Sequence, residues 1–263
     1  MRWLPFRRAR SNPIFCGGVA AFVQQSTRWS HGLNYLIVLS IVLFITWPKD
    51  NLLSLRDFPF TYNALGGSIL IILSYLSFSH GSRKALGSDY LSLHDWLALA
   101  PLRAGAFMRG YVAVAVLDLL FFWAIALPLM VLAAGVSGES LAHLGVGLLI
   151  ILVCTVTYRI IGIALLVLLE RDEFLLYILV RICYVFFILV SGFTVPLLNP
   201  VLAFADASIW PPRLGAWWLS GVALKGWVAT IVLHLLLGGG FFIIAIVRGY
   251  LIQRRTAPTL TNE

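Results

Sequence analysis

Long stretches of the chain contain no charged residue and alternate with short polar segments. Residues 29–48 and 58–82 carry no Asp, Glu, Lys or Arg, and the later apolar stretches enclose single charges at Asp118, Arg159 and Arg181. A helix needs about 20 mainly apolar residues to cross the roughly 30 Å of hydrocarbon in a bilayer. The pattern therefore predicts six transmembrane spans, at residues 32–47, 64–80, 108–133, 142–169, 174–196 and 222–247.

Two further kinds of element are predicted outside these spans. Residues 11–29 open with a helix start, because Ser11 or Asn12 can cap the first turn and Pro13 fits there without losing a hydrogen bond. The stretch is apolar on one broad face but too short to span, so it predicts an interfacial helix. Between spans five and six, a segment rich in proline and tryptophan predicts broken helices at the outer surface.

Composition agrees with this pattern and sets the class of the protein. Of the 263 residues, 60% are hydrophobic and only 11% are charged, against about 25% charged in an average soluble domain. The mean hydropathy is +0.94. We therefore expect an all-α polytopic membrane protein in which residues 1–263 form a single transmembrane domain.

The distribution of Lys and Arg predicts the orientation in the membrane. Thirteen of the 19 basic residues lie on the segments that six spans place on the side of both termini. The opposite loops hold only Lys49, Arg56 and Arg213. Because basic residues favour the cytoplasmic side, both termini are predicted to be cytoplasmic. This topology, together with contact with anionic membrane lipids, explains the net charge of +8, and no nucleic-acid partner is expected.

A short, half-charged segment, "SDYLSLHDWLALAPLR" at residues 88–103, lies between spans two and three. Ser92 and Asp95 are spaced as in a capping box, in which two side chains satisfy backbone N–H groups at a helix start. Pro101 ends the helix, because the residue before a proline is disfavoured in the α region. The pattern predicts a short cytoplasmic helix at residues 91–100, with one face free to meet a partner.

Three charged residues fall deep inside the predicted spans, away from the span ends. Each costs about 2.5–3.5 kcal/mol on insertion scales unless it is paired or hydrated. Counted from the cytoplasmic helix ends, Asp118, Arg159 and Arg181 lie at similar depths, roughly 12–17 Å, so they can meet at one level. One interpretation is an ion pair of Asp118 with either arginine that fixes helix packing. The other is that the surplus arginine contacts an anionic substrate, such as a phosphate-bearing lipid carrier.

The chain contains no recognisable motif for enzyme catalysis. The sequence contains no G-x-x-x-x-G-K-[ST], no H-E-x-x-H and no G-x-S-x-G motif. Its three cysteines form no paired motif, and no acidic cluster suits a metal. We therefore predict no catalytic residue, no metal site and no cofactor in this chain. His234, in the last span, is expected to be a hydrogen-bonded packing residue.

The chain resembles the membrane subunit of ABC transporters of the type-2 (ABC-2) exporter class. The resemblance rests on "NPIF" at residues 12–15 and on "HDWLALAPLRAGAFMRG" at residues 94–110, with an Asn-Pro pair at residues 199–200 after span five. The order and spacing of the six spans agree as well. Within the second motif, the matching positions are Asp95, Pro101, Leu102 and Gly110.

This resemblance implies a permease in the bacterial cytoplasmic (inner) membrane that forms the path of an ATP-driven exporter. It implies a homodimer or a paired permease, with a separately encoded cytoplasmic ABC ATPase subunit that carries ATP and Mg. The helix at 91–100 would then be the coupling helix, and residues 169–174 either a solvated turn or a second contact. The residues assigned to this coupling are Asp89, His94, Asp95, Trp96, Pro101, Arg103, Glu170, Arg171, Asp172 and Glu173.

Two other classes of function remain open on the sequence. One is a membrane scaffold that transports nothing. The other is a secondary carrier or channel that uses Asp118, Arg159 and Arg181 as its ion or proton path. The sequence of the spans does not indicate which substrate an exporter of this kind would carry.

Overall fold

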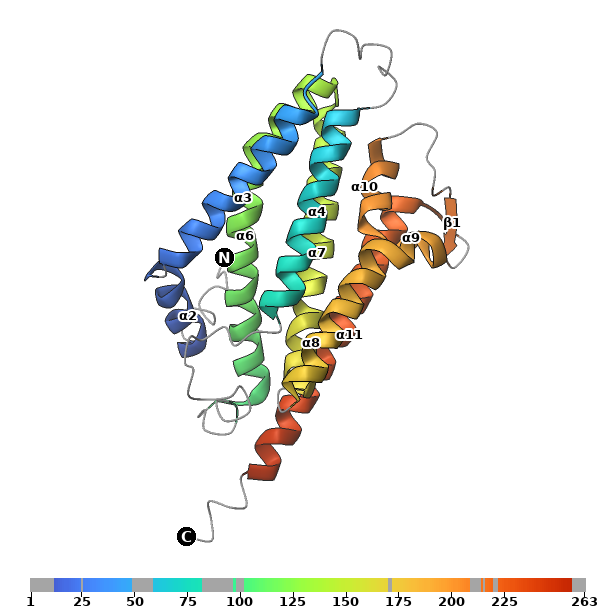
Figure 1. Ribbon diagram of the computed structural model, residues 1–263. Helices are drawn as coiled ribbons and strands as arrows, with labels where there is room; N and C mark the ends of the chain where they lie inside the picture. Colours follow the sequence, from blue (N-terminus) through green and yellow to red (C-terminus); the bar gives the residue numbers. More distant parts are fainter. Residues whose placement is uncertain are drawn as a thin grey trace, which may run out of the picture.

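The computed structural model shows a bundle of long helices (Figure 1). It describes residues 12–24, 26–48, 59–81, 97, 102–169, 172–208, 214, 216–219 and 222–256. Within these ranges, six helices are long and apolar enough to cross a membrane. The chain is thus a multi-pass helical membrane protein, and the predicted polytopic α-helical class is confirmed.

The six spans lie close to their predicted ranges. The fifth span is composite, because α8 continues through a π-helical turn (η2) into α9. The bounds are α3 Ser26–Ile45, α4 Phe60–Gly81, α6 Ala104–Ser137, α7 Leu141–Leu169, α8 Glu173–Val185 with η2 Phe186–Val190 and α9 Ser191–Thr194, and α11 Gly226–Thr256.

The last span begins later than its sequence predicts. Residues 222–225 form strand β2 (Val222–Lys225), which pairs antiparallel with β1 (Ala216–Leu219), so α11 starts only at Gly226. Before this hairpin, a 3-10 turn η3 (Pro196–Leu198) and α10 (Pro200–Ser208) supply the short, broken helices predicted after span five.

The N-terminal helix α2 (Pro13–Gln24) is shorter than the predicted 11–29, because residues from Ser26 onward already belong to α3. It also runs lengthwise beside α6 (Figure 1). Its start reaches Ala106, whose carbonyl accepts a hydrogen bond from Asn12 Nδ2 at 2.8 Å, and its far end places Phe22 5.9 Å from the Phe121 ring. Side-chain and backbone contacts to α6 therefore set its direction.

Two asparagine–proline pairs start short helices in the same way. Asn12 Oδ1 accepts from Ile14 N at 3.0 Å, while its amide nitrogen bonds Ala106 in α6. Asn199 Oδ1 accepts from the backbone N–H groups of residues 201 and 202, and its amide nitrogen donates to Ile188 O at 2.9 Å. Each asparagine thus caps its own helix and ties it to a second one, and the proline needs no N–H in the first turn.

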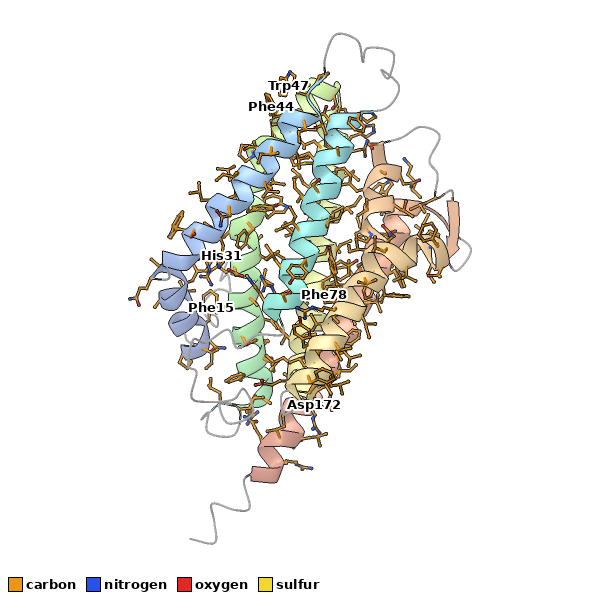
Figure 2. All side chains as sticks on the ribbon, viewed as in Figure 1. Phe15, His31, Phe44, Trp47, Phe78 and Asp172 are labelled. Atoms are coloured by element: carbon orange, nitrogen blue, oxygen red, sulfur yellow. The ribbon has the colours of Figure 1, made fainter. Side chains whose placement is uncertain are left out.

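Helix α7 is the centre of the bundle, with α4 and α11 packed against it. Close approach depends on Gly147, where a Cβ would overlap the Tyr62 hydroxyl and lie 2.7 Å from Phe204 Cε2. Deeper in the bundle, the Phe78 ring (Figure 2) stacks on Tyr158 at 4.8 Å. Small residues and stacked rings thus bring α4, α7 and α10 together.

The two ends of the bundle are marked by Trp47 and Asp172, which Figure 2 labels at opposite ends. We call them the Trp47 end and the Asp172 end. The C-terminal part of α11 projects beyond the other helices at the Asp172 end (Figure 1). Helix α6 also begins there, with Arg103 as its exposed N-cap residue.

Replacement of Gly147 by valine is expected to destabilise the bundle by about 1–3 kcal/mol, because the added side chain overlaps Tyr62 and Phe204 and pushes both away from α7. Gly145→Val is the matched control on the same helix, since a Cβ there meets nothing within 4 Å, and it should change the stability by less than about 0.5 kcal/mol. Unfolding of both variants by dodecyl sulfate in mixed micelles measures the difference. Equal losses would contradict the close packing of α4, α7 and α10.

Candidate functional site

A carboxylate deep between the helices is paired with two arginines. Asp118 Oδ2 accepts from Arg159 Nη2 at 2.8 Å, and Asp118 Oδ1 lies 2.8 Å from Arg28 Nε. The ring nitrogen His80 Nδ1 lies 3.5 Å from Asp118 Oδ2. We call these four residues the Asp118 centre.

Four helices meet at the Asp118 centre. Arg28 comes from the first turn of α3, His80 from the last turn of α4, Asp118 from α6 and Arg159 from α7. The side chain of Arg159 is 2% exposed, whereas those of Arg28 and His80 are 19% and 29% exposed. The centre therefore has a buried side at α7 and a partly open side at α3 and α4.

Arg28 is held in place by helix α2 as well as by Asp118. Its Nη1 donates to Phe22 O at 3.1 Å, and its guanidinium lies 4.1 Å from the centroid of the Phe22 ring. This arrangement combines a hydrogen bond to the last turn of α2 with a cation–π contact. The junction between α2 and α3 is thus built around the same guanidinium that binds Asp118.

Arg181 does not join the Asp118 centre, although its depth along the sequence predicts that it can. Its guanidinium lies 3.1 Å from the centroid of the Tyr177 ring, and Nη1 donates to Tyr177 O at 3.2 Å. Leu176 and Val180 are the buried residues of α8, so the next position, Arg181, falls on the flank of that helix. The predicted pair of Asp118 with Arg159 is present, and Arg28 and His80 occupy the places around it.

Sequence reasoning missed Arg28 and His80 as partners of Asp118. Both lie at the ends of apolar stretches, where a basic residue is readily explained by topology alone. The sequence did contain a signal for them. A carboxylate inside the membrane needs a cationic partner, and Arg28 begins one span while His80 ends the next, so both lie on the same side of the membrane.

The predicted coupling residues are described only in part. Arg103 and Glu173 are exposed at the Asp172 end. Asp172 caps α8, with Oδ1 accepting from Leu175 N at 3.0 Å. The other predicted coupling residues lie outside the described part of the chain: Asp89, His94, Asp95, Trp96, Pro101, Glu170 and Arg171.

The amide of Gln253 in α11 joins the end of the predicted coupling segment to the last span. Its Nε2 donates to Leu97 O at 3.0 Å and to Leu102 O at 2.8 Å, and its Oε1 accepts from Ala104 N at 2.9 Å. Leu97 itself is fully buried. Both donor hydrogens and the acceptor of one side chain are therefore used to fix this segment against α11.

His234 lies in a separate buried network, as predicted for a hydrogen-bonded packing residue. Its Nδ1 is 2.8 Å from Thr230 O, a group that only accepts, so Nδ1 carries the hydrogen. Nε2 then accepts from the Tyr158 hydroxyl at 2.9 Å, and Thr157 Oγ1 donates to His234 O at 3.0 Å. These bonds tie α11 to α7.

Within the described residues, no group of three or more His, Cys, Asp or Glu side chains is arranged to hold a metal ion. The fold and site define a multi-pass helical membrane protein with a charge-paired centre where four helices meet. Comparison of the chain with protein-family models, curated proteins and solved structures gives no match. Its function is therefore inferred from its own residues.

Asp118→Asn should destabilise the bundle by about 3–5 kcal/mol, because it leaves Arg159 buried without its counter-charge. Asp172→Asn makes the same chemical change at an exposed helix cap, where asparagine caps equally well, so the loss should stay below about 1 kcal/mol. Dodecyl sulfate titration of both variants provides the comparison. Similar small losses in the two variants would show that Asp118 is not the counter-charge that holds these helices.

Proposed function

We propose that the chain is the permease subunit of an ATP-driven exporter of the ABC-2 type, in the bacterial cytoplasmic membrane with both termini cytoplasmic. The observation that carries the proposal is the Gln253 amide, which fixes the end of the predicted coupling segment to the last span. In this proposal the Asp172 end faces the cytoplasm, because most Lys and Arg residues belong to segments on that side.

The residues on which the family resemblance rests support the proposal by their contacts. Asn12 of the first motif lies directly on Gly110 of the second, where a Cβ would be only 2.7 Å from Asn12 Nδ2. The Asn-Pro pair after span five repeats the arrangement, with a Cβ at Gly192 falling 3.1 Å from Asn199 Nδ2. Glycine at these positions is thus explained by close contact with a capping asparagine.

The bonds of Gln253 suggest how ATP hydrolysis in a partner would reach the spans. A partner ATPase that carries ATP and Mg would press on the predicted coupling segment, whose Leu97 carbonyl accepts from Gln253. Because Gln253 bonds Leu97, Leu102 and Ala104, a displacement there moves α11 together with the start of α6. Helix α11 packs closely on α7, where a Cβ at Gly238 would lie 3.2 Å from Thr157 Oγ1. A displacement of α11 would therefore also displace α7, the central helix of the bundle.

The proposal also includes further ATPase contacts and a second permease. Arg103, Asp172 and Glu173 are exposed at the end where the ATPase would bind, so they are available as additional contacts. A second copy of the chain, or a paired permease, would complete the translocation path between two such bundles. This chain would bind its partner and conduct substrate, and the hydrolysis of ATP would occur in the partner.

Co-expression and co-purification with a candidate ABC ATPase subunit test the proposal directly. The wild-type chain should retain the ATPase through detergent purification, and the complex in nanodiscs should hydrolyse ATP at a rate different from that of the free ATPase. Asp95→Ala with Trp96→Ala should weaken binding at least about tenfold, the equivalent of about 1.4 kcal/mol. A chain that retains no ATPase, or double variants that bind and stimulate it as the wild type does, would favour a scaffold without transport.

Gln253→Leu should separate binding from coupling. The substitution keeps the side-chain volume but removes three hydrogen bonds, each worth about 0.5–1.5 kcal/mol. The ATPase should still bind, while the ATPase rate of the complex should move toward that of the free ATPase. Gln24→Leu, at an exposed position in α2, is the matched control and should leave the rate unchanged. Unaltered coupling in Gln253→Leu would exclude this amide as the link.

A further inference from the structure

The Asp118 centre carries more positive than negative charge. Asp118 supplies one carboxylate, and Arg28 and Arg159 supply two guanidiniums. A structural ion pair in an apolar bundle requires only one arginine, and Arg159 already fills that role from the buried side. The surplus charge is therefore that of Arg28, beside His80 on the partly open side of the centre.

The described contacts leave hydrogen-bond donors over on the open side. A guanidinium has five N–H donors, and the described contacts of Arg28 use Nε on Asp118 and Nη1 on Phe22 O. His80 directs Nδ1 at Asp118, and its Nε2, on the opposite side of the ring, is a further donor in the imidazolium form. On the buried side, Arg159 Nε has no hydrogen-bond partner among the described residues. The centre can thus donate to a further acceptor without giving up Asp118.

The centre lies at the level where the apolar part of two spans ends. The apolar stretch of α3 begins at Arg28, and that of α4 ends at His80. Exposed tryptophans at positions 29 and 47 lie near the two ends of α3, and the 18 residue steps from one to the other correspond to roughly 27 Å, close to the thickness of the hydrocarbon core. Because tryptophan prefers the membrane–water interface, this spacing places Arg28 and His80 at the edge of the hydrocarbon for α3 and α4, while α6 and α7 continue past Asp118 and Arg159 toward the Asp172 end.

We propose that Arg28 and His80 bind a phosphate group at this level, with Arg159 and Asp118 beneath them as their support. A planar guanidinium recognises phosphate oxygens through two parallel hydrogen bonds, and arginine favours this geometry over lysine. The phosphate belongs to a lipid headgroup or to a soluble phosphate that reaches the same depth. The inference needs only a membrane-spanning chain, so it stands or falls separately from the binding of an ATPase.

The test measures the thermal unfolding midpoint of the full chain in detergent as three ligands are titrated separately. Dioleoylphosphatidate and dioleoylglycerol differ by the phosphate alone, and inorganic phosphate supplies the anion without the lipid. Phosphatidate should raise the midpoint of the wild type, whereas dioleoylglycerol should not. Arg28→Gln should raise the half-saturating phosphatidate concentration about tenfold, since a charge-assisted hydrogen bond is lost. This variant keeps the buried pair of Asp118 with Arg159.

Arg181→Gln is the matched control, because it removes the same charge from a span arginine that does not contact Asp118. It should respond to phosphatidate as the wild type does. Arg28→Lys, which keeps the charge but loses the planar fork, and His80→Gln should both give intermediate half-saturation, and they provide the test if Arg28→Gln does not fold. Stabilisation by phosphatidate alone identifies a lipid headgroup as the source, and stabilisation by inorganic phosphate through Arg28 identifies a soluble anion. Equal effects of phosphatidate and dioleoylglycerol, or equal weakening in Arg28→Gln and Arg181→Gln, would overturn the proposal.

Discussion

The pairing of one carboxylate with two arginines is the interaction on which the arrangement of the helices depends. Asp118 joins α6 to α7 through Arg159 and to α3 through Arg28, and His80 brings the end of α4 to the same point. Asp118 and Arg159 are costly in apolar surroundings by themselves, and their mutual contact offsets that cost at the point where the four helices meet. Arg28 extends the constraint to α2 by its contacts with Phe22. The same constraint leaves one guanidinium in excess on the open side of the centre.

Single amide side chains make the other specific connections in this bundle. Lipid tails are as apolar as the helix surfaces, so burial of apolar area does little to select which helices pair, and hydrogen bonds and close packing decide. Asn12 and Asn199 each cap a short helix and bond a second one, and Gln253 binds three backbone groups between residues 97 and 104. These amides tie down the short elements at both ends of the bundle.

The spans could be predicted from the sequence to within a few residues at most ends, because charge-free length is a direct measure of membrane crossing. The pair of Asp118 with Arg159 was also within reach, since both charges lie at matching depth. The depth of a residue along a helix does not show which way its side chain points around the helix axis. Arg181 was therefore predicted to join Asp118, but its side chain contacts Tyr177 instead. The strand pair that delays α11 until Gly226 has no clear signal, because residues 222–224 are as apolar as the helix that follows. The helix at 91–100 remains a prediction.

A double-mutant cycle between Asp118 and Arg159 tests most directly whether this pairing organises the bundle. The free energy of unfolding would be measured for Asp118→Asn, for Arg159→Gln and for the two changes together. If the two side chains stabilise the bundle as a unit, the double variant should lose less than the sum of the single losses, with a coupling of about 0.5–3 kcal/mol. Additive losses, within about 0.3 kcal/mol, would contradict the account and leave the two charges as independent features of their helices.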